Sequence, residues 1–248
     1  MNLEKVIVKR DNKTIYRDGD LKIKVFDECY TKAEVLNEAL NQARVEETGL
    51  NVPAIVGIEC VDGKWAIVSE YITGKTLKQL LEENPDKEDE YVELMVNLHI
   101  DIFNQPCRIM NRLSDKLSGK IMESDLDAIT RFDMHRKIVE MPTRTKICHG
   151  DFTPSNITVA EDGKVYIIDW SHAAQGNASA DVVRTCLLLR LSGREEMAKK
   201  YFDLYCEKNG ADRDYAKRWF PIVAAALSTD ATGEDKKKLL GWIEKSDF

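Results

Sequence analysis

The chain has 248 residues, of which 43% are hydrophobic, so it is long enough for one large domain or two lobes with a substantial core. Its formal net charge of −7 argues against binding to nucleic acid, which requires a basic surface. No apolar run approaches the ~18 residues of a membrane span, and the charged N-terminus lacks the apolar stretch of a signal peptide. The six cysteines are widely spaced, which does not favour a disulfide framework. We therefore expect a cytoplasmic monomer or homodimer that binds neither nucleic acid nor membrane.

The first 72 residues predict a small antiparallel sheet with one helix. Strand-like apolar runs are separated by turn residues such as Asp18-Gly19 and Asp62-Gly63. In the third run apolar and polar residues alternate, so Lys22 and Lys24 lie on one face of the strand. We expect strands at residues 6–8, 14–16, 21–26, 52–56 and 65–69, and a helix at 31–47.

From Thr73 onward the pattern is mainly helical. Thr76 is placed to cap a helix that begins at Leu77. Residues 182–189 are apolar on nearly all sides, which indicates a buried helix, opened by Ser179. We expect further helices at 91–102, 126–141, 194–209, 213–228 and 234–245, with a hairpin turn at Asp162-Gly163.

One motif carries most of the functional information. Residues 147–156 read I-C-H-G-D-F-T-P-S-N, and residues 165–170 read V-Y-I-I-D-W. Phosphoryl transfer needs one carboxylate to orient the acceptor hydroxyl, and an amide oxygen and a second carboxylate to hold Mg²⁺ on the nucleotide phosphates. We predict Asp151 as the catalytic base and Asn156 and Asp169 as the metal ligands. An isolated Asp or Asn in a turn usually bonds its own backbone, but the complete spacing favours the catalytic interpretation.

The pattern H-G-D-x-x-x-x-N followed by I-I-D-W resembles the aminoglycoside phosphotransferase and choline kinase group of kinase-like enzymes. Protein kinases have the related H-R-D-x-x-x-x-N and D-F-G, but Gly150 and Trp170 point to the small-molecule branch. The resemblance implies an α+β, two-lobed protein-kinase-like fold with a small antiparallel sheet and one helix before a larger, mainly helical lobe. It implies a nucleotide-binding lobe at 1–72 and a lobe with the catalytic loop and acceptor site at 73–248.

The same resemblance implies a strand lysine that contacts the α- and β-phosphates and a glutamate of the next helix that holds it. Lys24 is the candidate lysine, and Lys22 is the alternative. Glu38 is the candidate glutamate, and Glu34 lies one turn earlier on the same helix face.

Three further positions follow from the resemblance. The backbone at Glu70 and Ile72, after the fifth strand, would recognise adenine, with a plain strand end as the alternative. Residues 9–15 stand where protein kinases have a glycine-rich loop, which leaves GTP open beside ATP. Asp181 either caps its helix or braces the backbone of the catalytic loop.

The sequence therefore predicts an ATP- and Mg²⁺-dependent phosphotransferase that moves the γ-phosphate to a hydroxyl of an amino alcohol, aminoglycoside or sugar. A protein kinase is an alternative, disfavoured because the interval from Trp170 to Ser179 is too short for a protein-substrate activation loop. A nucleotide-binding pseudoenzyme that regulates a partner is another, disfavoured by the complete motif. The helices after Gly193 are rich in acidic residues, and the chain ends with the carboxylate at Phe248. If these groups line the acceptor site, they favour a cationic acceptor. A neutral sugar or nucleoside is the alternative acceptor.

Overall fold

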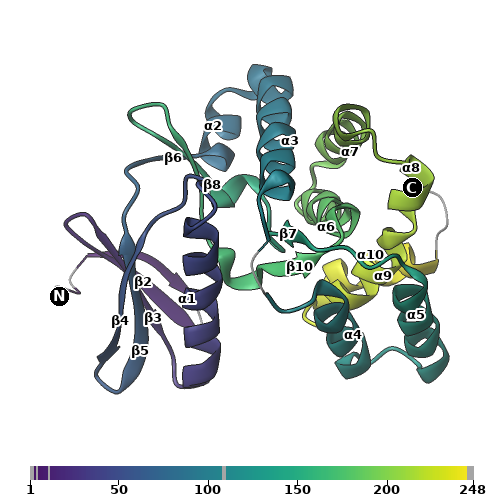
Figure 1. The fold of residues 1–248 in the computed structure, drawn as a ribbon, viewed down its shortest axis with the longest axis horizontal. Coiled ribbons are helices and arrows are strands. Elements are labelled where there is room, and N and C mark those ends of the chain that lie inside the picture. The colour runs from purple at the N-terminus through teal and green to yellow at the C-terminus, as the bar shows by residue number, and fades with distance from the viewer. Residues whose placement is uncertain (1–2, 4, 11, 108–109, 245–248) are drawn as a thin grey trace. The chain divides into compact units, whose positions relative to one another are not determined.

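The computed structural model describes residues 3, 5–10, 12–107 and 110–244 (Figure 1). The chain forms two compact units. One consists of Met1–Glu82 and Pro154–His172, and the other of Glu83–Thr153 and Ala173–Phe248. The chain therefore enters the first unit twice, the second time directly after the catalytic loop. The assignment of residues 1–72 to nucleotide binding and of 73–248 to the acceptor stays a prediction.

The first unit contains a five-stranded antiparallel sheet in the order β1-β2-β3-β5-β4. Its strands confirm four of the five predicted ones. The fourth predicted strand, at 52–56, was wrong in its bounds because the strand begins at Ile55 and runs to Val61. Pro53 lies in that predicted range and has no N–H for a strand partner. The strands are β1 (Val6–Arg10), β2 (Lys13–Asp18), β3 (Leu21–Phe26), β4 (Ile55–Val61) and β5 (Lys64–Glu70).

Helix α1 (Lys32–Glu46) lies alongside this sheet in Figure 1. It begins with a capping box in which Thr31 Oγ1 accepts a hydrogen bond from the Glu34 amide at 3.3 Å, and Glu34 Oε2 accepts one from the Thr31 amide at 2.7 Å. Its buried side is fixed by a cluster of Val35 and Ala39 with Phe26 and Ile67 of the sheet. The helix is thereby held against β3, the strand that carries Lys24.

A second, three-stranded sheet completes the first unit. It consists of β6 (Gly74–Thr76), β8 (Ile157–Ala160) and β9 (Val165–Ile167), in the order β6-β8-β9, and α2 (Leu77–Glu83) follows β6. The sequence did not predict β6. The backbones approach so closely there that a Cβ on Gly74 would lie 2.2 Å from the Val159 carbonyl oxygen. This pairing joins the segment after the catalytic loop to the first unit, where two 3₁₀ turns, Pro154–Asn156 and Trp170–His172, flank the hairpin.

The second unit is mainly helical, with one short antiparallel pair, β7 (Lys146–Cys148) and β10 (Ala174–Gly176). Helix α4 was not predicted. The prediction of a single helix at 213–228 was wrong, because this segment is divided into α8 and α9. The helices are α3 (Glu88–Asn104), which follows a 3₁₀ turn at Pro85–Lys87, α4 (Leu113–Glu123), α5 (Ala128–Glu140), α6 (Ala178–Leu191), α7 (Glu195–Asn209), α8 (Arg213–Lys217), α9 (Trp219–Ser228) and α10 (Gly233–Glu244).

Helix α6 forms the centre of this unit and confirms the prediction of a helix buried on nearly all sides. Val182, Val183 and Leu187 have no exposed surface. The helix begins one residue before the predicted Ser179, because the Asn177 side chain caps it by accepting from the Ser179 amide at 3.0 Å. Within the residues that the structure describes, no helix is both long enough and apolar enough to cross a membrane. The predicted α+β fold, a five-stranded sheet with one helix and then a mostly helical part, is confirmed.

Candidate active site

Three charged side chains of the first unit meet at one point. Lys24 of β3 is 5% exposed and forms an ion pair with Glu38 of α1. Its Nζ also lies 3.2 Å from Oδ1 of Asp169. The strand lysine and helix glutamate that the sequence favoured are therefore in direct contact. The alternative glutamate, Glu34, is used in the capping box at the start of the helix, and Lys22 lines the same cavity as Lys24.

The charges of this group stabilise one another. Burial alone would lower the pKa of Lys24, but Asp169 and Glu38 raise it above its ordinary value. Burial would raise the pKa of Asp169, but Lys24 and Lys13 hold it well below its usual range. Lys13 of β2 was not predicted as a site residue. Burial and the neighbouring Lys24 lower the pKa of Lys13. The one signal for Lys13 in the sequence was its place in the segment that stands where protein kinases have a glycine-rich loop.

The predicted metal ligands, Asn156 and Asp169, are linked through the backbone. The amide of Ile168 donates to the Asn156 carbonyl oxygen at 2.9 Å. Asp169 itself has φ of 61°, a left-handed conformation that is costly for a residue with a Cβ and is found mainly at functional sites. The next residue, Trp170, is fully buried, and its Nε1 donates to the Ile167 carbonyl oxygen at 3.1 Å. The buried Trp170 ring thus anchors the backbone next to Asp169.

These groups line a cavity of about 590 Å³ whose walls all belong to the first unit. The volume is in the range of small-molecule sites. Glu70, Tyr71 and Ile72 form part of its wall. The amide of Glu70 donates to the Ala54 carbonyl oxygen at 2.9 Å, and that of Tyr71 donates to the Asp20 carbonyl oxygen at 2.8 Å. Among the described residues no hydrogen bond uses the amide of Ile72, so this amide can donate to a ligand.

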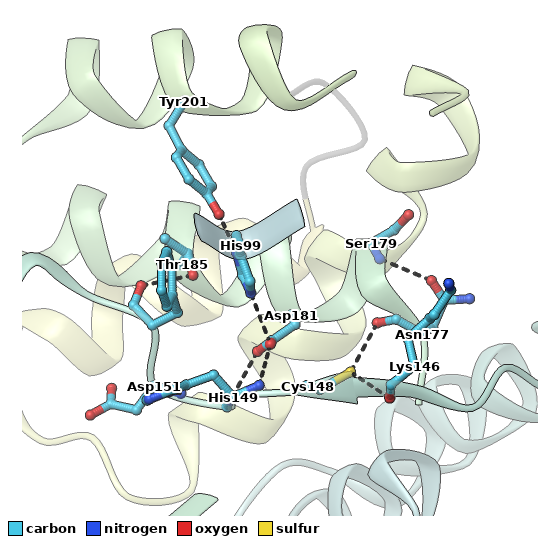
Figure 2. Close-up of polar contacts among 12 residues, drawn as sticks. His99, Lys146, Cys148, His149, Asp151, Asn177, Ser179, Asp181, Thr185 and Tyr201 are labelled. Atoms are coloured by element: carbon cyan, nitrogen blue, oxygen red, sulfur yellow. Dashed lines mark hydrogen bonds and ion pairs between the residues drawn. The ribbon is translucent and has the colours of Figure 1, made fainter. Parts of the chain in front are cut away.

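The predicted catalytic loop, residues 149–153, belongs to the second unit and is held by a buried carboxylate (Figure 2). Asp181 of α6 is 2% exposed and accepts hydrogen bonds from the amide of His149 at 2.6 Å and from that of Gly150 at 2.9 Å. The bracing interpretation of Asp181 is thereby confirmed, and Asn177 is the residue that caps the helix. Gly150 has φ of 78°, a conformation that glycine adopts without strain.

The loop directs Asp151 away from this network. The Asp151 amide donates to His149 Nδ1 at 3.1 Å, so His149 supports the loop. In Figure 2 the Asp151 carboxylate points away from Asp181 and from the hydrogen bonds around it. Asp181 and His149 therefore fix the backbone of the loop, and the Asp151 carboxylate points away from Asp181.

Several residues that support the loop were missed by the sequence analysis. His99 of α3 has its Nε2 at 3.0 Å from Asp181 Oδ2, its Nδ1 hydrogen-bonded to the Tyr201 hydroxyl, and its ring stacked on Phe152 with centroids 4.2 Å apart. Thr185 Oγ1 donates to the Phe152 carbonyl oxygen at 2.9 Å. Burial would raise the pKa of Asp181, but the hydrogen bond and charge of His99 lower it, so the carboxylate stays ionised. A histidine inside the apolar run of α3 was the only available signal.

Arg184 is a second unpredicted residue beside the loop. It lies on the same turn of α6 as Asp181 and Thr185, both of which contact the loop. Burial lowers the pKa of its guanidinium, and the carboxylates of Asp151, Asp181 and Asp230 raise it. Its buried Nε has no hydrogen-bond partner among the described residues. The guanidinium of Arg184 therefore interacts electrostatically with the predicted catalytic base.

Many of the late acids expected to attract a cationic acceptor form ion pairs with basic side chains. Asp230 lies 2.8 Å from Lys120, and Glu195 lies 3.1 Å from Arg190. Asp203 pairs with Arg213. The terminal carboxylate at Phe248 lies outside the described residues. These pairs reduce the local negative charge on which the cationic prediction depends.

Comparison with known proteins agrees with the fold and with the motif. A model of the phosphotransferase enzyme family matches residues 6–219. Among curated proteins, the KEOPS complex subunit Bud32 of Pyrococcus abyssi (strain GE5 / Orsay) is 30% identical over 219 residues, which cover 84% of this chain and 78% of Bud32.

Two solved structures show the same fold at low sequence identity. A choline/ethanolamine kinase family protein from Mesorhizobium loti has a TM-score of 0.64 and 13% identity, over 99% of this chain and 87% of its own. A thermostable mutant of the aminoglycoside phosphotransferase APH(4)-Ia, in a ternary complex with AMP-PNP and hygromycin B, has a TM-score of 0.71 and 12% identity, over 96% and 90%. The resemblance read from the motif is confirmed, and the chain belongs to the phosphotransferase enzyme family.

Proposed function

We propose that the protein transfers the γ-phosphate of ATP, with Mg²⁺, to a hydroxyl group of a small molecule. The observation that carries this proposal is the chain of contacts from Glu38 to Lys24 to Asp169 on the wall of one cavity, which Asn156 also lines. A buried lysine held between two carboxylates is suited to a polyphosphate, because it presents a fixed positive charge beside a carboxylate that can hold a cation.

In this proposal the first unit binds the nucleotide. Lys24 contacts the α- and β-phosphates, and Glu38 keeps its side chain extended toward them. Lys13 adds a second positive charge near the phosphates, in the segment that lacks the glycine-rich sequence. The backbone at Glu70 and Ile72 recognises the nucleobase, which the available Ile72 amide supports. Recognition of the nucleobase by backbone groups does not by itself select ATP over GTP as the phosphate donor.

The residues present fit a magnesium ion. Mg²⁺ prefers oxygen ligands and is usually held by one or two carboxylates together with substrate phosphates. Asp169 supplies an ionised carboxylate and Asn156 an amide oxygen, and both line the cavity. With two protein ligands, the substrate phosphates and water would complete the coordination. When bound, the ion would neutralise charge on the phosphates during transfer.

Asp151 is proposed to orient the acceptor hydroxyl and to accept its proton. Catalysis of phosphoryl transfer depends mainly on positioning and on charge stabilisation. The loop that carries Asp151 has its backbone fixed at His149 and Gly150 by the buried Asp181. A base held in this way typically contributes ~10²–10⁴ in rate.

The chemical class of the acceptor is set by the charges near Asp151. The predicted cationic acceptor relies on acids of the late helices, several of which are paired with basic residues. The positive charge of Arg184 interacts electrostatically with Asp151, which supports an acceptor with a carboxylate or phosphate group as much as one with an amine. Acceptors of all three charge types therefore belong in a substrate screen.

A second candidate function rests on the identity with Bud32, whose name is that of a KEOPS complex subunit. A relative that is a subunit of a complex supports a protein kinase or a nucleotide-binding regulator that works with a protein partner. The short interval between Trp170 and the start of α6 at Ala178 argues against a protein substrate bound along an activation loop.

The test is ADP formation from Mg-ATP in the presence of amino alcohols, aminoglycosides, neutral sugars, and hydroxy acids or sugar phosphates. Acceptor-dependent turnover that falls ~10²–10⁴-fold in Asp151→Asn, with ATP binding within a few-fold of wild type, would support the proposal. The matched control is Asp162→Asn, in the exposed hairpin turn between β8 and β9. Turnover near the wild-type rate in Asp151→Asn would reject Asp151 as the base, and phosphorylation of proteins alone would favour the second candidate.

A further inference from the structure

The second unit contains a cavity of about 400 Å³ that shares no residue with the proposed active site. It is lined by Arg112 and the first two turns of α4, the last two turns of α5 with residues 141–145, residues 175–177, and Trp219 at the start of α9. Residues 143–145 lead directly into β7, and the chain leaves the other end of β7 toward His149 and Asp151. The cavity and the catalytic loop therefore lie at opposite ends of this strand.

The cavity wall contains a buried hydrogen-bond donor that has no acceptor. Trp219 is 3% exposed, and its Nε1 has no hydrogen-bond partner among the described residues. An indole N–H can only donate, and buried donors in native proteins nearly always have an acceptor. Because Trp219 lines the cavity, an acceptor atom of a bound molecule can satisfy this donor.

Positive charge surrounds the same cavity. Arg112 and Arg144 both line it, and neither side chain forms an ion pair or hydrogen bond with the described residues. Arg112 is also the N-cap residue of α4, where no side chain caps the helix, so the positive end of the helix dipole is directed to this region. The lining also contains the carboxylate of Asp115, which accepts from Ser114 Oγ at 3.3 Å and offsets only one of the two arginine charges.

Apolar side chains also line the cavity. Ile138 and Val139 of α5, with Met141 and Pro142 after it, contribute hydrocarbon surface, and Val139 is 71% exposed. A pocket with an apolar wall and a few convergent polar groups is typical of sites for small organic molecules.

We propose that this cavity is a second ligand site, and that it binds a small organic anion. The charged group, a phosphate or a carboxylate, accepts a hydrogen bond from Trp219 Nε1 and pairs with Arg112 and Arg144. The hydrocarbon part of the ligand lies against the end of α5. The site is separate from the nucleotide cavity and does not depend on the proposed reaction.

The indole N–H signals of the full-length ¹⁵N-labelled protein test this proposal directly, because the chain has four tryptophans and the Trp219 signal can be assigned with Trp219→Phe. The probes are phenyl phosphate, benzoate, inorganic phosphate and benzyl alcohol. We expect phenyl phosphate or benzoate to shift the Trp219 signal at millimolar concentration, inorganic phosphate to bind more weakly, and benzyl alcohol to leave the signal unchanged. The two organic anions distinguish phosphate from carboxylate as the charged group.

Arginine variants show whether the anion binds specifically at this cavity or is attracted by positive charge in general. Arg112→Gln and Arg144→Gln should each weaken binding of the organic anion by about tenfold, the scale of a charge-assisted hydrogen bond. The control is Arg136→Gln, on α5 but paired with Asp133 and Glu140, which should leave the affinity unchanged. The proposal is overturned if neither organic anion moves the Trp219 signal at ~10 mM, if benzyl alcohol moves it equally, or if all three arginine variants behave alike.

Discussion

Replacing Asp181 with Asn tests how the catalytic loop is held. Three donors lie around its buried carboxylate: the amide of His149 at 2.6 Å, the amide of Gly150 at 2.9 Å and His99 Nε2 at 3.0 Å. An Asn side chain has one oxygen, so at least one donor loses its acceptor and the others lose the negative charge. A hydrogen bond to a charged group contributes ~1.5–3 kcal/mol and a neutral one ~0.5–1.5 kcal/mol. We therefore expect the free energy of unfolding to fall by about 3 kcal/mol, near the lower end of the range for a broken buried pair.

The assay is urea unfolding of the wild type and of Asp181→Asn, with Asp203→Asn as the control. Asp203 also carries a carboxylate paired with a basic residue, but its side chain is 41% exposed. Its replacement should cost less than ~1 kcal/mol, as for other exposed pairs. A loss in Asp181→Asn no larger than that of the control, with an unchanged dependence on urea concentration, would refute the view that this carboxylate fixes the loop.

The same variant has a functional readout that general destabilisation does not share. The proposed nucleotide cavity belongs to the first unit, whereas Asp181 and the predicted catalytic loop belong to the second. Asp181→Asn should therefore lower kcat while the affinity for Mg-ATP stays within a few-fold of wild type, measured well below the unfolding transition. An equal loss of nucleotide affinity would show that the effect is not confined to the loop.

Three further predictions follow from the charges described above. Asp169→Ala should abolish the Mg²⁺-dependent thermal stabilisation by ATP. Asn156→Ala should weaken this stabilisation, and a higher Mg²⁺ concentration should partly restore it. A thermal shift in Asp169→Ala equal to that of wild type would exclude Asp169 as a metal ligand. Lys24→Met should cost much more activity than Lys22→Met, because Lys24 contacts both Glu38 and Asp169; the opposite order of kcat/KM would assign the phosphate contact to Lys22. Folding lowers the pKa of Asp181, so the contribution of this carboxylate to stability is present above the ordinary Asp value of ~3.9 and is lost as the pH falls through the lowered folded value. The difference in unfolding free energy between wild type and Asp181→Asn should therefore shrink below about pH 4. A difference that does not change between pH 3 and 7 would contradict this.

Elements with a strong local signal could be predicted from the sequence, and elements with a mixed signal could not. Thr31 marked the start of α1, and the alternation of apolar and polar residues predicted β3, the strand that carries Lys24. Helix α4 has a regular apolar stripe at Leu113, Leu117 and Ile121, all buried, yet it was missed. Its interior contains Gly119, which weakens the helical pattern, and its N-cap residue has no side chain that can accept a hydrogen bond.

The candidate site shows a similar limit. The motif residues lie within one segment of the chain, so their spacing was visible directly. The residues that support them come from distant elements: His99 and Asp181 are in contact across 82 residues, and Lys24 and Asp169 across 145. Contacts of this kind depend on the packing of helices and strands, which residue types alone do not specify.

Asn156 follows Asp151 by five positions, and the chain crosses from one unit to the other within this interval. The chain passes from the second unit to the first between Thr153 and Pro154, so the two motif residues are held by different parts of the protein. The backbone leading to Asp151 is fixed from α6 through Asp181, and the backbone of Asn156 is fixed by the Ile168 amide next to Asp169. A short connection limits how far the proposed base can move from the proposed metal ligand, since each residue spans at most ~3.6 Å. In the proposed phosphoryl transfer, the length of this connection therefore contributes to positioning beside the side chains themselves.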